Sequence, residues 1–138
     1  MDNTLEAGSV AKDFEMRDRD GNLVKLSDFK GKLVYMDIWA TWCGPCVEEI
    51  PNMEKLYQHY KDDPQILLVS VSVDSKKNLW EKKLDGDKLQ WPQYIVDGAL
   101  KDKLYNEYII TGIPRFMMFD SEGRIITINA MRPSNGKL

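Results

Sequence analysis

With 138 residues, the chain is long enough for one compact domain that buries its own core. Its composition is ordinary for a globular protein: 43% of the residues are hydrophobic, 30% are charged, and the formal net charge is −3. No basic stripe is present, which argues against nucleic acid as a partner. No apolar run is long enough to span a membrane.

The first predicted elements are a β-hairpin, a buried strand and a helix. Residues 14–26 form two short segments around an Asp-Gly turn, which is typical of a hairpin. The nearly unbroken apolar run over residues 33–40 predicts a central strand that is buried on both faces. A helix over residues 45–60 should follow, because its apolar side chains recur at helical spacing, and Pro51 should kink it.

Strands and helices continue to alternate in the rest of the chain. The predicted elements are a strand over 66–73, a helix over 75–84, a short strand over 94–96, a helix over 100–108 and a strand pair over 115–120 and 124–130. Asp74 or Ser75 should cap the first of these helices. The fold class is therefore α/β, with a mixed sheet, an N-terminal β-hairpin and helices on both faces.

The two ends of the chain carry no predicted element. We expect a single domain over residues 1–138, in which residues 1–7 and 131–138 are tails. The first residues lack the charged and apolar regions of a signal peptide. Two interpretations stay open: a cytoplasmic protein, or a protein whose targeting segment is absent from this sequence.

The chemistry of the chain is expected at its only two cysteines, Cys43 and Cys46, which lie between a predicted strand and a predicted helix. A disulfide across so short a loop removes little entropy from the unfolded chain, so a purely structural role is disfavoured. The first turn of a helix offers unpaired N–H groups and the positive end of the helix dipole. These groups would stabilise a thiolate on Cys43.

This placement predicts different roles for the two sulfurs. Cys43 should be the more exposed one, and it would attack a substrate disulfide to form a mixed disulfide. Cys46, one helical turn further on, would attack Cys43 and release the reduced substrate. Pro45 fits the first helical turn, where its nitrogen needs no hydrogen bond. A zinc site would need about four ligands, and His59 is the only histidine in the chain, so no metal is expected.

Residues 37–46 resemble the active-site block of the thioredoxin superfamily, which carries the same Gly-Pro pair between its cysteines. Pro51 stands where thioredoxins kink the active-site helix, and residues 111–114 resemble the cis-proline loop that packs against the dithiol. The resemblance implies a thioredoxin-like sheet. It also implies a cis bond between Ile113 and Pro114, since cis bonds are confined in practice to X–Pro.

A narrower resemblance, to the TlpA/ResA group, rests on residues 11–14, 26–32 and 119–125. That group is typically extracytoplasmic, often periplasmic, and reduces protein disulfides in pathways fed by a membrane reductase. The resemblance therefore implies protein disulfides as substrates and an upstream thiol reductase as a partner. It implies no cofactor beyond the redox-active disulfide of Cys43 and Cys46.

The resemblance also assigns expected roles around the dithiol. Asp37 matches a buried aspartate that assists proton transfer at the second cysteine, and burial should raise its pKa. Glu49 matches a glutamate near the dithiol, although an exposed helix acid would give the same pattern in the sequence. Pro114 completes the expected catalytic set. The residues expected to contact substrate are Trp42, Gly44, Pro45, Ile113 and Arg115.

Two features depart from the family pattern. Arg115 stands where threonine usually follows the cis-proline, so a cation there would favour the Cys43 thiolate, contact a substrate or point into water. The final helix that usually covers one sheet face is missing from the predicted elements, although a truncated sequence would give the same result. An uncovered apolar face would favour self-association.

Two alternative functions stay open at this level. A peroxiredoxin-type peroxidase would use Cys43 on a similar fold, but Ala40 stands where its threonine is normally found, and Cys46 is too close for the usual resolving role. A binding module with a vestigial dithiol is disfavoured by the intact active-site sequence. The favoured interpretation is a thioredoxin-like oxidoreductase that reduces protein disulfides.

Overall fold

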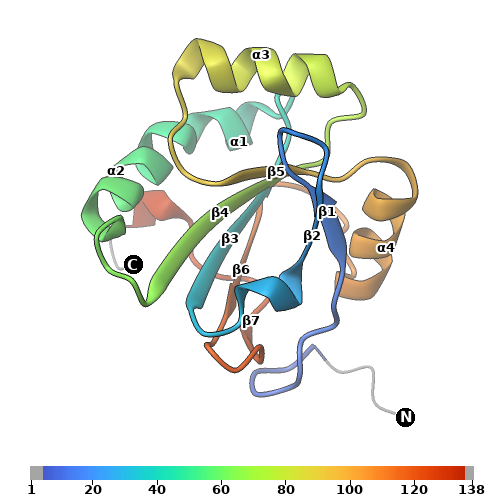
Figure 1. Cartoon of the computed structure of the whole chain (residues 1–138), viewed down its shortest axis with the longest axis vertical. Helices are drawn as coiled ribbons and strands as arrows, with labels where there is room; N and C mark the ends of the chain where they lie inside the picture. The colour runs from blue at the N-terminus through green and yellow to red at the C-terminus, as the bar shows by residue number, and fades with distance from the viewer. Residues whose placement is uncertain (1–4, 136–138) are drawn as a thin grey trace.

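The computed structural model describes residues 5–135 and joins its strands in one mixed sheet (Figure 1). The strands are β1 (Glu15–Arg17), β2 (Leu23–Lys25), β3 (Leu33–Trp39), β4 (Ile66–Ser72), β5 (Gln93–Ile95), β6 (Arg115–Phe119) and β7 (Ile125–Thr127). The helices are α1 (Gly44–Glu48), α2 (Ile50–Tyr60), α3 (Lys77–Asp87) and α4 (Gly98–Tyr108), and the 3-10 helices are η1 (Leu26–Phe29) and η2 (Pro133–Asn135). The predicted α/β class and thioredoxin-like architecture are confirmed.

The strand order is β2-β1-β5-β4-β3-β6-β7, so β3 lies in the interior of the sheet. It runs parallel to β4 and antiparallel to β6. Both β3 and β4 are largely buried because their sequences, LVYMDIW and ILLVSVS, are apolar at nearly every position. The polar exceptions are Asp37, Ser70 and Ser72, and all of them are buried.

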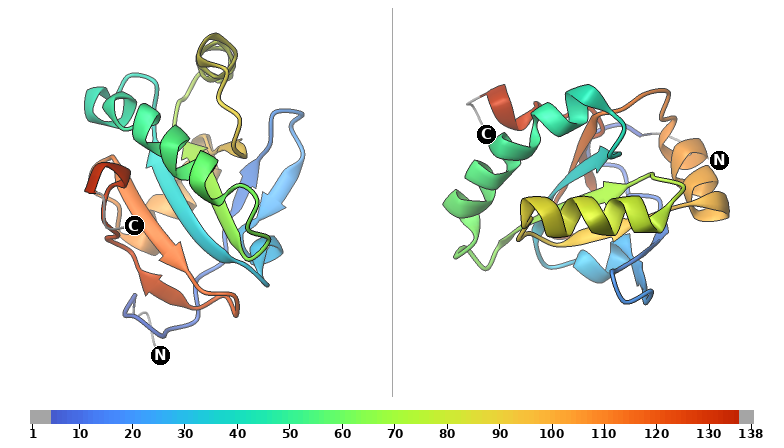
Figure 2. Two further views of the ribbon diagram at one scale, coloured as in Figure 1. Left: turned by 90° about the vertical axis from the view of Figure 1, so that its left-hand side faces the viewer. Right: turned by 90° about the horizontal axis from the view of Figure 1, so that it is seen from above.

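Helices cover both faces of the sheet, as predicted (Figure 2). α2 and η2 lie on one face, and α4 lies on the other. The smaller apolar cluster consists of Tyr35, Met53, Leu68, Trp91 and Phe116. α3 and α4 contribute Trp80, Leu84, Leu104 and Tyr108 to the larger cluster, which also contains both cysteines. The dithiol therefore lies where the end of β3 meets the packed core.

The helix that follows the dithiol is divided into two. The sequence pattern predicts one kinked helix, and the structure has α1 and α2 separated at Glu49. Pro51 lies in the first turn of α2, where its missing N–H leaves no helical hydrogen bond unmade. Because Pro51 cannot donate to the carbonyl of Val47, the hydrogen bonds of α1 do not continue into α2.

The predicted cap of the next helix is wrong. α3 begins at Lys77 after Lys76, and neither Asp74 nor Ser75 caps it. The Asp74 carboxylate instead accepts hydrogen bonds from the N–H and the hydroxyl of Thr41, 33 positions earlier in the chain. A tertiary contact therefore occupies the side chain that looked like a local cap.

The predicted C-terminal tail over residues 131–138 is also wrong for the part that the structure describes. The Tyr35 hydroxyl donates to the carbonyl of Met131 at 2.6 Å, Pro133 is buried, and η2 contacts α2. Within residues 5–135, η2 rather than an α-helix follows β7. Of the predicted N-terminal tail, Leu5 packs against the core, and residues 1–4 and 136–138 lie outside the described part.

Candidate active site

Cys43 and Cys46 form a disulfide at the start of α1, just beyond the end of β3. Cys43 is the N-cap residue of α1, and its Sγ accepts a hydrogen bond from the Cys46 N–H at 3.2 Å. Pro45 lies in the first turn of this helix. The sequence forms a helix start here because Cys43 is extended, Pro45 has a helical φ, and the sulfur receives one of the free N–H groups.

Both sulfurs belong to residues that are mostly buried. In the disulfide form Cys43 is 6% exposed and Cys46 is 3% exposed, so the difference has the predicted direction but is small. The neighbouring residues are more open, because Trp42 is 67% exposed and Gly44 and Pro45 are also exposed. An approaching substrate therefore meets this rim beside the Cys43 sulfur.

The loop that precedes β6 lies against the dithiol. The Cys43 Sγ is 3.8 Å from the carbonyl oxygen of Ile113, which is 70 positions further along the chain. The peptide bond between Ile113 and Pro114 is cis. The fold thus brings this loop together with the two cysteines, as the resemblance implies.

Asp37 lies on β3 and is only 6% exposed. Its Oδ2 accepts a hydrogen bond at 3.1 Å from the hydroxyl of Ser70 on the neighbouring strand β4. Burial raises the pKa of Asp37 to about 7, while the Ser70 hydroxyl lowers that pKa and the charge of Glu49 raises it. The pKa of Asp37 is therefore raised in the predicted direction and by the predicted cause, burial.

Glu49 lies between α1 and α2 and is 7% exposed, so the alternative of an exposed helix acid is wrong. Its Oε2 accepts from the hydroxyl of Ser134 at 2.7 Å, and its Oε1 accepts from the N–H of the same residue at 3.1 Å. The Asn52 amide donates to Oε1 at 3.3 Å. The C-terminal segment therefore holds this buried acid in place.

Arg115 lies at the start of β6 and is partly buried. Its Nη2 donates to the carbonyl of Ile109 at 3.5 Å, at the end of α4. Its Nη1 is buried and has no hydrogen-bond partner among residues 5–135. One nitrogen of the guanidinium is therefore buried while the other contacts the end of α4 at an exposed position, and the expected effects of Arg115 on the thiolate or a substrate stay predictions.

Three residues that support the site were missed by the sequence analysis. Ser70 donates to Asp37, Trp91 donates from its Nε1 to Ser70 at 2.8 Å, and Asp74 accepts from Thr41. A signal was present in β4, where serines interrupt an otherwise apolar strand at alternate positions. A buried hydroxyl in such a strand needs a partner, but the sequence does not identify it.

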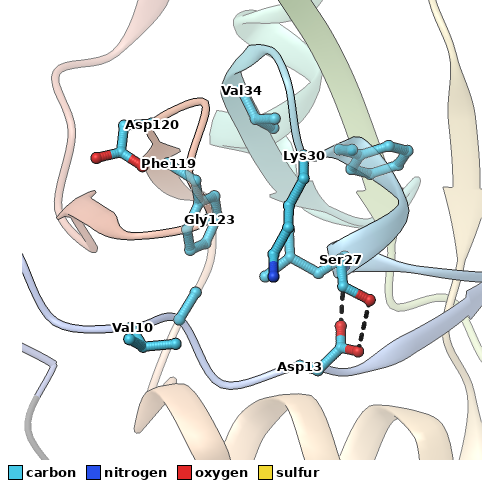
Figure 3. A pocket seen from close by; sticks show the side chains of 11 residues that line it. Val10, Asp13, Ser27, Lys30, Val34, Phe119, Asp120 and Gly123 are labelled. Carbon is cyan, nitrogen blue, oxygen red and sulfur yellow. Dashed lines mark hydrogen bonds between the residues drawn. The ribbon is translucent and has the colours of Figure 1, made fainter.

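The structure also has a cavity of about 170 Å³, whose lining side chains are drawn in Figure 3. It is lined by Val34, at the start of β3, and by Phe119, at the end of β6, so it lies at the opposite end of these strands from the cysteines. The Asp13 carboxylate at its edge accepts hydrogen bonds from the N–H and hydroxyl of Ser27. This cavity is separate from the site described above.

Within the described residues, no cluster of His, Cys, Asp or Glu side chains is suited to a metal ion. The side chain of His59 is exposed and stands edge-on to Tyr60, 4.5 Å between ring centroids. No helix in residues 5–135 is both long and apolar enough to cross a membrane.

The sheet, the disulfide at a helix start and the adjacent cis-proline loop together define an oxidoreductase of the thioredoxin type. Comparison with protein families agrees, because the Redoxin profile matches residues 6–135. The chain belongs to the Redoxin family.

Individual relatives place the chain near ResA. It is 34% identical over 121 residues to the thiol-disulfide oxidoreductase ResA of Geobacillus kaustophilus (strain HTA426), covering 88% of this chain and 67% of the relative. A crystal structure from Bacteroides vulgatus, of a protein classed as a thiol-disulfide oxidoreductase, is 40% identical with a TM-score of 0.89, and covers 97% of this chain and 92% of that one.

A second structure, the thioredoxin domain of another thiol-disulfide oxidoreductase from Bacteroides vulgatus, is 34% identical with a TM-score of 0.84, and covers 94% of this chain and 91% of that one. Together, these relatives and the disulfide between Cys43 and Cys46 identify the chain as a TlpA/ResA-like thiol–disulfide oxidoreductase. The peroxidase alternative is not favoured.

Proposed function

We propose that this thiol–disulfide oxidoreductase reduces protein disulfides, with Cys43 as the attacking thiol and Cys46 as the resolving thiol. The main support is the hydrogen bond of 3.2 Å from the Cys46 N–H to the Cys43 Sγ. An N–H group at a helix start stabilises a thiolate more than a thiol, so Cys43 is the sulfur that ionises more readily.

The reaction takes two exchange steps. In the first, the Cys43 thiolate attacks one sulfur of the substrate disulfide and forms a mixed disulfide with it. The substrate S–S bond breaks, and the other substrate sulfur leaves as a thiolate that takes up a proton. In the second, Cys46 loses its proton and attacks the Cys43 Sγ, so the Cys43–Cys46 disulfide forms and the bond from Cys43 to the substrate breaks. The second substrate sulfur leaves as a thiolate that takes up a proton. The substrate disulfide gains two electrons and the enzyme dithiol loses two. An upstream thiol reductase then returns two electrons to the enzyme disulfide.

Asp37 is proposed as the group that accepts the proton of Cys46. Its pKa of about 7 means that carboxylate and carboxyl forms are both populated near neutral pH, which suits a general base. The buried acid Glu49 contributes by raising that pKa. Pro114 and its loop hold the backbone against the Cys43 sulfur.

The proposed substrate surface surrounds the Cys43 sulfur. Trp42 offers an exposed indole ring of the kind that anchors polypeptides at interfaces. The other proposed contacts are Gly44, Pro45, Ile113 and Arg115.

Reduction of insulin by dithiothreitol tests the function. The protein should accelerate it, Cys43→Ser should abolish the acceleration, and Cys46→Ser should accumulate a mixed disulfide with substrate. Alkylation of the reduced protein should modify Cys43 well below pH 8.5, near which free cysteine ionises. If Cys46 reacts first, the proposed roles are reversed.

The proposed direction of electron flow rests on the Gly-Pro pair between the cysteines and on Asp37 behind them. Equilibration with glutathione should give a reduction potential closer to that of thioredoxin, about −270 mV, than to that of strongly oxidising family members, about −120 mV. A value near the second figure would indicate an oxidant.

We also propose an extracytoplasmic location, with a periplasmic compartment as the finer expectation, because the TlpA/ResA resemblance implies it. Fractionation of cells that express the gene from its native start tests this location. Recovery of the protein with cytoplasmic markers alone would contradict it.

A further inference from the structure

A row of buried polar side chains crosses three neighbouring strands. Asp37 on β3 stands opposite Ser70 on β4, which stands opposite Gln93 on β5. Directly opposed residues point to the same face of a sheet, so these side chains are neighbours. Asp37 is 6% exposed, Ser70 1% and Gln93 7%, so little bulk water reaches their polar atoms. Within residues 5–135, Asp37 and Ser70 are hydrogen-bonded to each other, whereas neither polar atom of the Gln93 amide has a partner.

Trp91, which is 3% exposed, makes the second hydrogen bond to the Ser70 hydroxyl and so fixes the position of its oxygen. Its Nε1 lies 2.8 Å from the Ser70 Oγ, and that Oγ lies 3.1 Å from the Asp37 Oδ2. An indole N–H only donates, so the Ser70 hydroxyl accepts from Trp91. The Ser70 hydroxyl has a single proton, and it donates that proton to the Asp37 Oδ2.

This direction determines which oxygen of Asp37 exchanges a proton. Because Oδ2 accepts from Ser70, the neutral carboxyl carries its proton on Oδ1. We propose that Ser70 and Trp91 are positioning residues that keep Oδ2 of Asp37 as an acceptor and leave Oδ1 to take up and release the proton. The proposal rests on the proposed function, in which Asp37 accepts the proton of Cys46.

The other groups around Asp37 do not supply this bond. The titratable group on β3 next to Asp37 is Tyr35, and its hydroxyl donates to the carbonyl of Met131 instead. The titratable group between α1 and α2 is Glu49, which affects Asp37 through its charge. The dithiol of α1 is the group that Asp37 serves in the proposed function. On β6 the opposed residue is Phe116, which is apolar. Among the described residues, Ser70 is the one that donates a hydrogen bond to the Asp37 carboxyl.

The test is a ¹³C NMR titration of the Asp37 carboxyl in the oxidised protein, which does not depend on catalysis. Ser70→Ala removes a donor that favours the carboxylate, so the titration midpoint should rise by about one pH unit. Trp91→Phe should give a smaller rise, because the Ser70 hydroxyl stays but loses its fixed orientation. Ser70→Thr keeps the hydroxyl and should keep the midpoint.

Ser72→Ala is the matched control. It removes an equally buried hydroxyl from the same strand, one that donates to Asp74 instead, so the midpoint of Asp37 should not move. Circular dichroism verifies that each variant is folded. An unchanged or lower midpoint of Asp37 in Ser70→Ala overturns the proposal. If Ser70→Ala does not fold, Trp91→Phe takes its place, and an unchanged Asp37 midpoint in that variant overturns the proposal.

A second measurement separates this proposal from the proposed function. The rate at which Cys46 resolves the mixed disulfide should fall about fivefold at pH 7 in Ser70→Ala, because a smaller share of Asp37 is ionised. A midpoint that moves while the rate profile stays unchanged supports the positioning role of Ser70 but refutes the role of Asp37 as proton acceptor.

Discussion

Asp37 is a carboxyl group in the middle of an apolar strand, and its surroundings determine its charge. The unfolded chain releases the proton near the ordinary pKa of 3.8, whereas the folded protein holds it until about pH 7. Between these values the folded protein binds more protons than the unfolded chain, so the free energy of unfolding falls as the pH rises. Over the whole range between these two pKa values, the free energy of unfolding falls by about 4 kcal/mol.

Asp37→Asn should remove this loss while keeping an acceptor for Ser70. At pH 8 the oxidised variant should be more stable than the unmodified protein by up to about 4 kcal/mol, and at pH 4 the two should be nearly equal. Urea unfolding at both pH values measures the difference. A constant difference across pH would contradict the raised pKa of Asp37.

Glu49 is linked to the same titration because its charge raises the pKa of Asp37. Glu49→Gln should therefore lower the Asp37 titration midpoint in NMR. It should also lower the free energy of unfolding by about 1 kcal/mol, because the bonds from Ser134 weaken. The control is Glu48→Gln, an exposed neighbour that should change neither quantity. A lowered midpoint in both variants would point to general surface charge instead.

At the scale of the elements, the dithiol is positioned by a helix start and by the loop that leads to it. The loop is fastened at Thr41, whose N–H donates to Asp74 at 3.1 Å and whose hydroxyl donates to it at 2.7 Å. Asp74 follows the end of β4. The parallel strands β3 and β4 therefore hold the catalytic loop through one carboxylate.

Asp74→Ala should leave the donors of Thr41 without an acceptor and lower the free energy of unfolding by about 2–4 kcal/mol. Hydrogen exchange of the Thr41 amide should become faster, which locates the effect. Asp74→Asn keeps one acceptor for Thr41 and should lower the free energy of unfolding by less. Asp97→Ala is the control, since this exposed aspartate precedes α4 without a side-chain cap bond. If Asp74→Ala and Asp97→Ala lower the free energy of unfolding equally, the hydrogen bonds from Thr41 to Asp74 do not hold the loop.

At the scale of the whole molecule, the C-terminal segment completes one face. Residues 131–135 accept from Tyr35 and donate to Glu49, and η2 packs on α2 (Figure 2). This segment covers part of the face on which sequence analysis expected an exposed apolar surface. Self-association and a single domain over residues 1–138 stay predictions.

A chain that ends at residue 130 should lose these contacts. We expect its free energy of unfolding to fall by about 2–4 kcal/mol in urea, because two buried polar groups lose partners. Light scattering should show more association, because apolar surface around Tyr35 is uncovered. A chain that ends at residue 135 keeps the named contacts and is the control. If both chains behave alike, the segment contributes nothing to this face.

Much of the fold follows from local patterns. Apolar runs predicted β3 and β4, helical spacing predicted the helix after Cys43, and Pro51 predicted a kink where the structure divides that helix in two. The errors lie where a distant partner replaces a local one. Asp74 looked like a helix cap, and residues 131–135 looked like a tail, because neither pattern reveals a partner far along the chain.

The sequence by itself determined the class of chemistry, because two cysteines at a helix start and a proline loop of known type are local features. Only the tertiary structure decided how the acids behave. Ser70 reaches Asp37 across 33 positions, and Ser134 reaches Glu49 across 85. A pKa depends on burial and on such partners, and both arise only when distant strands and the C-terminal segment pack together.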